Sequence, residues 1–226
     1  ILKKVVDKYN YIINLSGYVD HSNKIETIKV HYDGLKNLAD HFLNKKISNF
    51  IQIGSSLEYG NLKSPQKEKL TGRPAGYYGT AKHKASKYLQ KINIKFNFPF
   101  TILRLYQVYG PNQKYNRLIP FTIKNCLQNK EFNCSEGNQL RDFLFVDDFT
   151  NLIEKILRQK SKNKIFNVGY GQPVTVKKVI ELIAKKTKKG RPNFGALKMR
   201  KEEIKKLYPD ISLVKNTFKW YPNKNL

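Results

Sequence analysis

Short apolar segments alternate with longer amphipathic ones in the first half of the chain, and this alternation constrains the fold more than any other feature. Apolar residues concentrate at 9–17, 49–56 and 100–106, and each segment is short enough for a buried strand. Between them, residues 26–44 and 77–93 carry apolar side chains at helical spacing. Connections of this length let neighbouring strands run parallel, with helices on the faces of the sheet. The pattern predicts an α/β fold containing part of a doubly wound parallel sheet.

A smaller second lobe is predicted after residue 110, where the pattern changes. Its helices and strands are expected at 117–128, 141–146, 149–158, 164–171 and 176–187. Asp147 or Asp148 is placed to cap the helix 149–158, and Thr175 to cap the helix 176–187. We divide the chain into residues 1–110 and a mixed α/β lobe of residues 111–226, with some chain crossing between the two. Residues 2–8 are predicted to be the end of a helix.

The chain carries a formal net charge of +26, and a charge of this size suggests a nucleic-acid partner. Of the 43 Lys and Arg residues only seven are arginine, whereas the side chains that read bases and phosphates in two-pronged contacts are mostly arginines. The lysines are also spread along the whole chain. These observations favour a lysine-coated surface over a nucleic-acid site.

The four histidines and two cysteines are scattered, and we predict no metal site. Cys126 and Cys134 do not have the spacing of a zinc site and are expected to be reduced. No apolar run approaches the ~20 residues of a membrane span, and no signal peptide is recognisable. We therefore expect a cytoplasmic protein that does not associate with membranes.

Tyr78 and Lys82 are four residues apart in the predicted helix 77–93, so they share one of its faces. The pair alone is weak evidence for catalysis, because it occurs by chance in many helices. Ala81 and Ala85 would let this face approach the sheet. Ser55 ends the preceding strand, and sites in parallel α/β sheets form at the carboxyl ends of strands. A nearby ammonium lowers the pKa of a phenol from about 10, so the three polar residues suit proton transfer at a secondary alcohol.

Seven motifs in the chain resemble motifs of one protein family, and they occur in the same order as in that family. They are YIINLSGYVDHS, VHYDGLKNL, IGSSLEYG, YYGTAK, LRLYQVYGP, RDFLFVDD and FKWYP. The chain resembles the extended short-chain dehydrogenase/reductase family, in its NAD-dependent branch of nucleotide-sugar epimerases, dehydratases and reductases. The resemblance implies a Rossmann-like domain, NAD or NADP as the cofactor, a nucleotide sugar as the substrate, and a homodimer in the complete protein.

The resemblance also implies roles for individual residues. Tyr78 matches the catalytic acid/base, Lys82 the residue that holds the nicotinamide ribose, and Ser55 the hydroxyl that binds the reacting sugar oxygen. The expected cofactor-binding residues are Gly17, Tyr78, Lys82 and Tyr106. The expected substrate-binding residues are Ser56, Gln107, Arg117, Arg141 and Arg200. Two positions depart from the family, because His31 and Gln107 stand where it usually has Asn.

The glycine-rich turn that binds a dinucleotide pyrophosphate is absent from the sequence, which contains no GxGxxG or GxxGxxG. The chain also begins near the helix that precedes the family's fourth strand. We therefore expect a C-terminal portion of the enzyme, with its first three strands missing. We expect the 226 residues alone to be inactive and to bind NAD(P) poorly.

The predicted function is NAD(P)-dependent oxidoreduction at C4 of a nucleotide-activated hexose, in the synthesis of surface polysaccharides. Both a 4-epimerase and a 4-keto-6-deoxy-sugar reductase remain open. A 4,6-dehydratase is not expected, because neither Ser56 nor Leu57 can act as a general acid. Glu58 comes next and is expected on Ser56's side of the strand. The alternative is a non-catalytic or basic nucleic-acid-associated protein on the same scaffold.

Overall fold

The computed structural model describes residues 9–20, 22–159, 162, 164–200 and 203–226. Four strands form its main sheet in the order β1-β2-β3-β8, and every pairing in it is parallel. They are β1 (Tyr11–Asn14), β2 (Asn49–Ser55), β3 (Phe100–Leu105) and β8 (Lys164–Val168). The predicted parallel α/β sheet is confirmed. The helix predicted at residues 2–8 lies outside the described residues.

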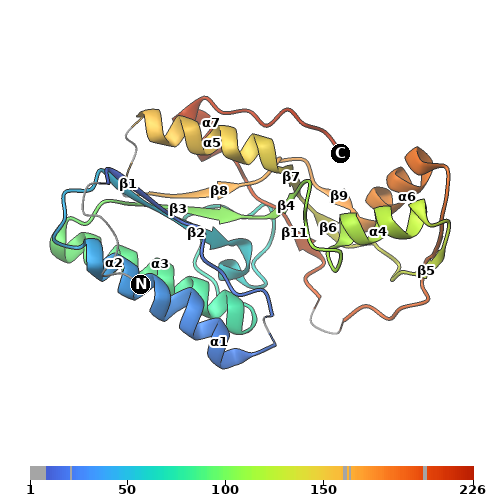
Figure 1. Ribbon diagram of the computed structural model, residues 1–226, viewed down its shortest axis with the longest axis horizontal. Helices are drawn as coiled ribbons and strands as arrows, with labels where there is room; N and C mark the ends of the chain where they lie inside the picture. The colour runs from blue at the N-terminus through green and yellow to red at the C-terminus, as the bar shows by residue number, and fades with distance from the viewer. Residues whose placement is uncertain (1–8, 21, 160–161, 163, 201–202) are drawn as a thin grey trace.

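Helices cover both faces of this sheet (Figure 1). One face carries α2 (Gly34–Phe42) and the long α3 (Gly76–Phe96), and the other carries α5 (Val146–Gln159) and α7 (Ser212–Phe218). The predicted helix 26–44 is a continuous helical segment, formed by α1 (Lys24–Ile28), a π-helix (Lys29–Asp33) and α2.

Two buried cores result, because successive residues of a strand point to opposite faces. Ile51 and Leu103 belong to the core under α5 and α7. Their neighbours Phe50 and Ile102 belong to the core under α2 and α3. Strands buried on both faces explain the nearly continuous apolar runs in the sequence.

The remaining elements form a smaller group to one side of the sheet (Figure 1). Its helices are α4 (Leu118–Leu127) and α6 (Val176–Thr187). Its strands are β4 (Gln107–Tyr109), β5 (Glu131–Asn133), β6 (Leu140–Arg141), β7 (Phe143–Phe145), β9 (Val174–Thr175), β10 (Arg191–Asn193) and β11 (Lys206–Leu207). The chain returns from this group to the main sheet through β8. The division at residue 110 stays a prediction.

Two local predictions need correction. The strand predicted at 141–146 is two strands, because the buried Asp142 carboxylate between them accepts hydrogen bonds from the backbone N–H groups of Tyr170 and Gly171. Helix α5 begins at Val146, so Asp147 and Asp148 lie in its first turn and do not cap it. The Thr175 cap is confirmed, because its hydroxyl accepts from the Lys178 N–H at 3.2 Å.

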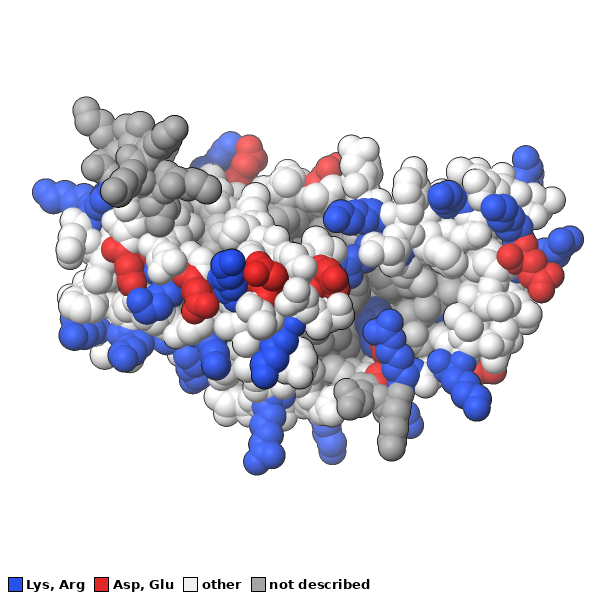
Figure 2. Space-filling view, turned by 60° about the horizontal axis from the view of Figure 1, so that its bottom comes forward, with Lys and Arg blue, Asp and Glu red and all other residues white. Residues whose placement is uncertain are grey.

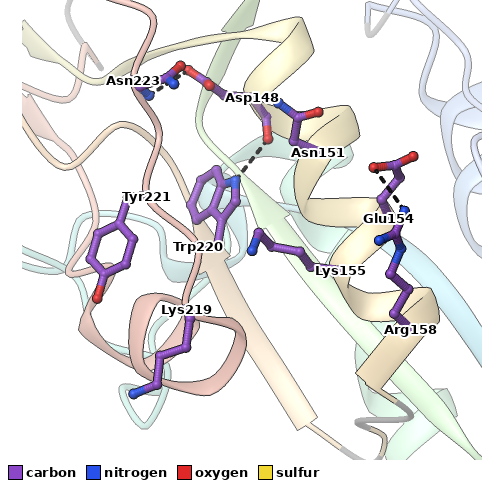
Figure 3. A pocket seen from close by; sticks show the side chains of 9 residues that line it. All are labelled: Asp148, Asn151, Glu154, Lys155, Arg158, Lys219, Trp220, Tyr221 and Asn223. Atoms are coloured by element: carbon purple, nitrogen blue, oxygen red, sulfur yellow. Dashed lines mark hydrogen bonds and ion pairs between the residues drawn. The ribbon is translucent and has the colours of Figure 1, made fainter.

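Asp148 has a different role, shown in Figure 3. Its carboxylate accepts hydrogen bonds from the backbone N–H groups of Asn223 and Lys224, and its carbonyl accepts from the Trp220 indole at 3.0 Å. The segment after α7 is thereby held against α5. No helix among the described residues is long and apolar enough to span a membrane. In the same part of the chain, no cluster of three or more His, Cys, Asp or Glu could hold a metal ion.

Candidate active site

A cavity of about 370 Å³ opens at the carboxyl ends of β2 and β3. It brings together predicted site residues from four separate stretches of the chain: Ser55, Ser56, Tyr78, Tyr106, Gln107 and Arg117. A cavity of similar size lies between α5 and the segment after α7, lined by residues such as Lys155, Trp220 and Tyr221 (Figure 3). That second cavity contains none of the predicted site residues, so we place the candidate active site in the first.

Ser55 lies where β2 gives way to a 3-10 helix, Ser56–Tyr59. Its hydroxyl accepts from the Leu57 N–H at 3.2 Å, and its own N–H donates to Glu58 Oε1 at 2.9 Å. These reciprocal bonds form a capping box that starts the short helix. The expectation that Glu58 shares Ser56's side of a strand is wrong, because the chain leaves the strand at Ser56. Glu58 is instead buried behind the cavity.

Lys82 lies behind Tyr78 and is 3% exposed. Its ammonium donates to the Ile53 carbonyl at 2.8 Å and lies 5.8 Å from the centroid of the Tyr78 ring. Burial lowers the pKa of Lys82 to about 8, and the negative charge of Glu58 opposes this shift. Lys82 is therefore largely protonated at neutral pH and loses its proton in the mildly alkaline range.

The pKa of Tyr78 differs from the expectation that Lys82 lowers it. Burial raises the pKa of the Tyr78 phenol, while its hydrogen bond with Ser55 and the positive charge of Arg117 act in the opposite direction. Removing a phenolate from water disfavours the charged form, and this effect is the largest here. Tyr78 is thus a protonated phenol at neutral pH, in hydrogen-bond contact with Ser55.

Small residues let α3 approach the sheet closely, as predicted. Ala81 and Ala85 are fully buried. At Gly79, an added Cβ would lie 2.7 Å from the Leu57 carbonyl oxygen, which is closer than real Cβ atoms come to backbone. Gly79 therefore allows Tyr78 and Ser55 to meet.

His31, which stands where the family usually has Asn, is a neighbour of Tyr78. Its ring meets the Tyr78 ring edge to face, with the centroids 4.9 Å apart, and it is 5% exposed. It lies on the π-helix, where the extra residue in the turn changes which side chains face α3. Gly17 is exposed, does not line the cavity, and has His31 as its nearest neighbour, at 3.4 Å from the position of an added Cβ.

Arg141 and Arg200 line an adjoining cavity of about 660 Å³, which shares Leu57, Gln107 and Leu207 with the first. The Arg141 guanidinium forms an ion pair with Glu203 and donates to the Leu140 carbonyl at 2.7 Å. Burial lowers the pKa of Arg141, and Glu203 opposes that shift. Arginine side chains therefore line both cavities, Arg117 in the first and Arg141 and Arg200 in the second.

The remaining predicted site residues also line the first cavity, but they differ in exposure and in hydrogen bonding. Tyr106 is 7% exposed, and its hydroxyl donates to Gln66 Oε1 at 2.8 Å, so the phenol is already engaged. Gln107 and Arg117 are exposed, and Arg117 is near enough to affect the pKa of Tyr78.

The residues present fit one end of a nicotinamide dinucleotide. Lys82 has three N–H donors, and the Ile53 carbonyl accepts from one of them, which leaves donors for the hydroxyls of a ribose. Tyr78 and Ser55 lie in the adjoining polar cavity, where the reacting ring of the cofactor would meet a substrate alcohol. The 226 residues contain no glycine-rich turn for the pyrophosphate. The residues present therefore fit the nicotinamide ribose and not the pyrophosphate.

Comparisons with known proteins point to one family. The family model described as "NAD dependent epimerase/dehydratase family" matches residues 1–169. The chain is 34% identical over 118 residues to CDP-abequose synthase from Salmonella muenchen, covering 51% of this chain and 40% of that protein. It is 27% identical over 183 residues to dTDP-D-glucose 4,6-dehydratase from Dictyostelium discoideum, covering 72% of this chain and 42% of that protein.

The fold matches that of solved structures over nearly its whole length. The Y149F mutant of UDP-glucuronic acid 4-epimerase from Bacillus cereus, in complex with a UDP-sugar and NAD, superposes with a TM-score of 0.90 at 22% identity. The match covers 99% of this chain and 74% of that one. The chain spans about half the length of the curated relatives it matches. Since the family model covers most of the chain, the protein belongs to the NAD dependent epimerase/dehydratase family.

Proposed function

We propose that the complete protein is an NAD(P)-dependent oxidoreductase that acts at C4 of a nucleotide-activated hexose. The observation that carries the proposal is the meeting of Ser55 and Tyr78 in one cavity, with Lys82 buried directly behind them. The similar proteins support it, since their names include a nucleotide-sugar epimerase and a 4,6-dehydratase.

Tyr78 is the group that moves the proton. In the oxidising direction the C4–H bond breaks with loss of hydride, and the C4 hydroxyl proton passes to the phenolate form of Tyr78, which must first have lost its own proton. In the reducing direction Tyr78 donates its proton to the ketone oxygen. A nicotinamide cofactor, when bound, would accept or supply the hydride. The raised pKa of Tyr78 keeps it protonated, which is the form needed to donate to a ketone.

Ser55 and Lys82 position the reacting groups. The Ser55 hydroxyl, in hydrogen-bond contact with Tyr78, holds the C4 oxygen against the phenol. The Lys82 ammonium binds the cofactor ribose and places positive charge beside the Tyr78 ring. Both side chains extend from regular elements, Ser55 from the end of β2 and Lys82 from α3, so their geometry is set before substrate arrives.

The nucleotide part of the substrate has a matching set of cations. Arg141 and Arg200 line the adjoining cavity, and Arg117 lies at the first one. Guanidinium groups bind the oxygens of a diphosphate in two-pronged, charge-assisted hydrogen bonds. Gln107 lines both cavities and Ser56 lines the first, so both offer polar groups to the substrate. The sugar would then extend from the diphosphate towards Ser55.

Both a 4-epimerase and a 4-keto-6-deoxy-sugar reductase are compatible with this site. An epimerase returns the hydride to the opposite face of the ketone, and a reductase delivers it once. We further propose a cytoplasmic role in making sugars for surface polysaccharides. We also propose a homodimer for the complete protein.

The alternative, a basic nucleic-acid-associated protein, is less well supported. Figure 2 shows Lys and Arg side chains distributed over the visible face, with acidic side chains among them. A nucleic-acid site would gather cations into one patch or stripe. The test of the proposal is turnover of a panel of nucleotide hexoses by the complete protein with NAD or NADP. Conversion at C4 supports it, and no conversion together with salt-sensitive DNA binding favours the alternative.

A further inference from the structure

The Glu58 carboxylate occupies a buried position between three elements of the candidate active site. Its side chain has 0% exposure. Oε1 accepts from the backbone N–H of Ser55 at 2.9 Å, while Oε2 accepts from the Ser86 hydroxyl at 2.7 Å and from Arg104 Nε at 3.0 Å. Ser55 ends β2, Ser86 belongs to α3 and Arg104 to β3. One carboxylate therefore joins the elements that carry the reactive groups.

The surrounding residues are arranged to accept this buried charge. Gly54 leaves space for it, because an added Cβ there would lie 2.6 Å from Glu58 Oε1. Arg104 supplies the opposite charge and also stacks on Tyr59, with the guanidinium carbon 4.4 Å from the ring centroid. A buried carboxylate without such partners would be strongly unfavourable.

We propose that Glu58 is a positioning residue for the active site, which holds Ser55 and α3 at a set separation and places a negative charge beside Lys82. The inference rests on the proposed function, because Ser55 and Lys82 act only if that function is right. Glu58 does not line the active-site cavity and would not touch the substrate. Its influence passes through the Ser55 backbone and through the Ser86 turn of α3, one turn beyond Lys82.

The charge of Glu58 has a defined electrostatic direction. It raises the pKa of Lys82 and so opposes the burial that lowers it. It also raises the pKa of Tyr78. Both effects favour the protonated forms of Lys82 and Tyr78. Among the described residues, other titratable or charged groups near Glu58 are Arg104 from β3, Lys82, His83 and Lys87 from α3, Tyr59 beside it, and Glu68 and Lys69 from the loop before α3.

Two variants of the complete protein separate the effect of the Glu58 charge from the effect of its hydrogen bond to α3. Glu58→Gln keeps the size of the side chain and removes its charge. Ser86→Ala removes one hydrogen bond and leaves the charge in place. We expect Glu58→Gln to lower kcat by up to about 10²-fold with little change in KM for the nucleotide sugar, since misplacing reactive groups costs that much. We also expect the alkaline limb of its pH–rate profile to move to lower pH. Ser86→Ala should leave that limb where it is.

The control for folding is the double variant Glu58→Gln/Arg104→Met, which removes both buried charges. If Glu58→Gln does not fold, the double variant takes its place, with the same expected shift of the alkaline limb. The inference would be overturned if the variant that folds has the wild-type kcat and an alkaline limb at the wild-type pH. A fall in activity explained by the folded fraction, with an unmoved limb, would also overturn it. Tyr78→Phe is measured in parallel, because wild-type activity in that variant would refute the proposed function and not the role of Glu58 alone.

Discussion

The Nζ atom of Lys82 lies 5.8 Å from the centroid of the Tyr78 ring, one turn further along α3. The same atom donates to the Ile53 carbonyl at 2.8 Å, so its direction is set by the backbone of β2. The ammonium is therefore held beside the phenol by the sheet and by the helix together.

Replacing Tyr78 by Phe removes the proton donor and leaves the ring packed against His31. We expect kcat to fall by about 10²–10⁴-fold, which is what general acid–base catalysis contributes. Binding of the nucleotide sugar, measured by calorimetry on the complete protein, should change little. A Phe variant with near-normal turnover would remove Tyr78 from the mechanism.

The activity should decline as the pH rises through the pKa of Lys82, which burial lowers to about 8 from 10.5. The protonated form is the active one, because the ammonium binds ribose hydroxyls. The kcat/KM profile should therefore show an alkaline limb near pH 8. In Lys82→Arg the charge persists at high pH, so the limb should disappear even though activity is lower. A wild-type profile that stays flat until about pH 10.5 would argue against this role.

Arg141 should bind the diphosphate of the substrate. We expect Arg141→Ala to weaken binding of a nucleoside diphosphate by about 10–100-fold, since hydrogen bonds to charged groups contribute about 1.5–3 kcal/mol. The matched control is Arg158→Ala, which removes an arginine whose side chain is 78% exposed and lies 3.9 Å from Glu154. Titration calorimetry should show normal affinity for the control. Equal affinities in both variants would exclude Arg141 from the substrate site.

Gly79 should tolerate no larger residue without loss of activity. In Gly79→Ala the new methyl would lie 2.7 Å from the Leu57 carbonyl, which forces α3 away from the segment that follows Ser55. Overpacking of this kind destabilises proteins by about 1–3 kcal/mol. We expect a lower midpoint in denaturant and a lower kcat. The control is Thr80→Ala, which removes a methyl group and a hydroxyl bonded to the Gly76 carbonyl of its own helix.

The sheet and its helices could be predicted from the sequence, since strands such as 49–55 and 100–105 are buried on both faces and are therefore rich in apolar residues. The pairing of Tyr78 with Lys82 could be predicted because it depends only on helical spacing. These features follow from local periodicity.

Other features could not be predicted, because they depend on contacts between distant segments. Asp142 breaks a strand by accepting hydrogen bonds from Tyr170 and Gly171. Glu58 looked like a strand residue, and its partner Arg104 is far away in the sequence. The contact between His31 and Tyr78 depends on a π-helix, which has no clear sequence signal. The net direction of the Tyr78 pKa shift depends on burial, which spacing alone does not give.

The most direct test of the proposed function is hydride transfer from C4. The complete protein is mixed with NAD or NADP and with nucleotide hexoses that carry either hydrogen or deuterium at C4, and the reduced nicotinamide is followed by absorbance in a single turnover. We predict that the nicotinamide becomes reduced, that deuterium at C4 slows this reduction, and that Tyr78→Phe slows it by about 10²–10⁴-fold. Turnover of the sugar without reduction of the nicotinamide, or reduction at a rate unaffected by deuterium at C4 and by Tyr78→Phe, would contradict the account.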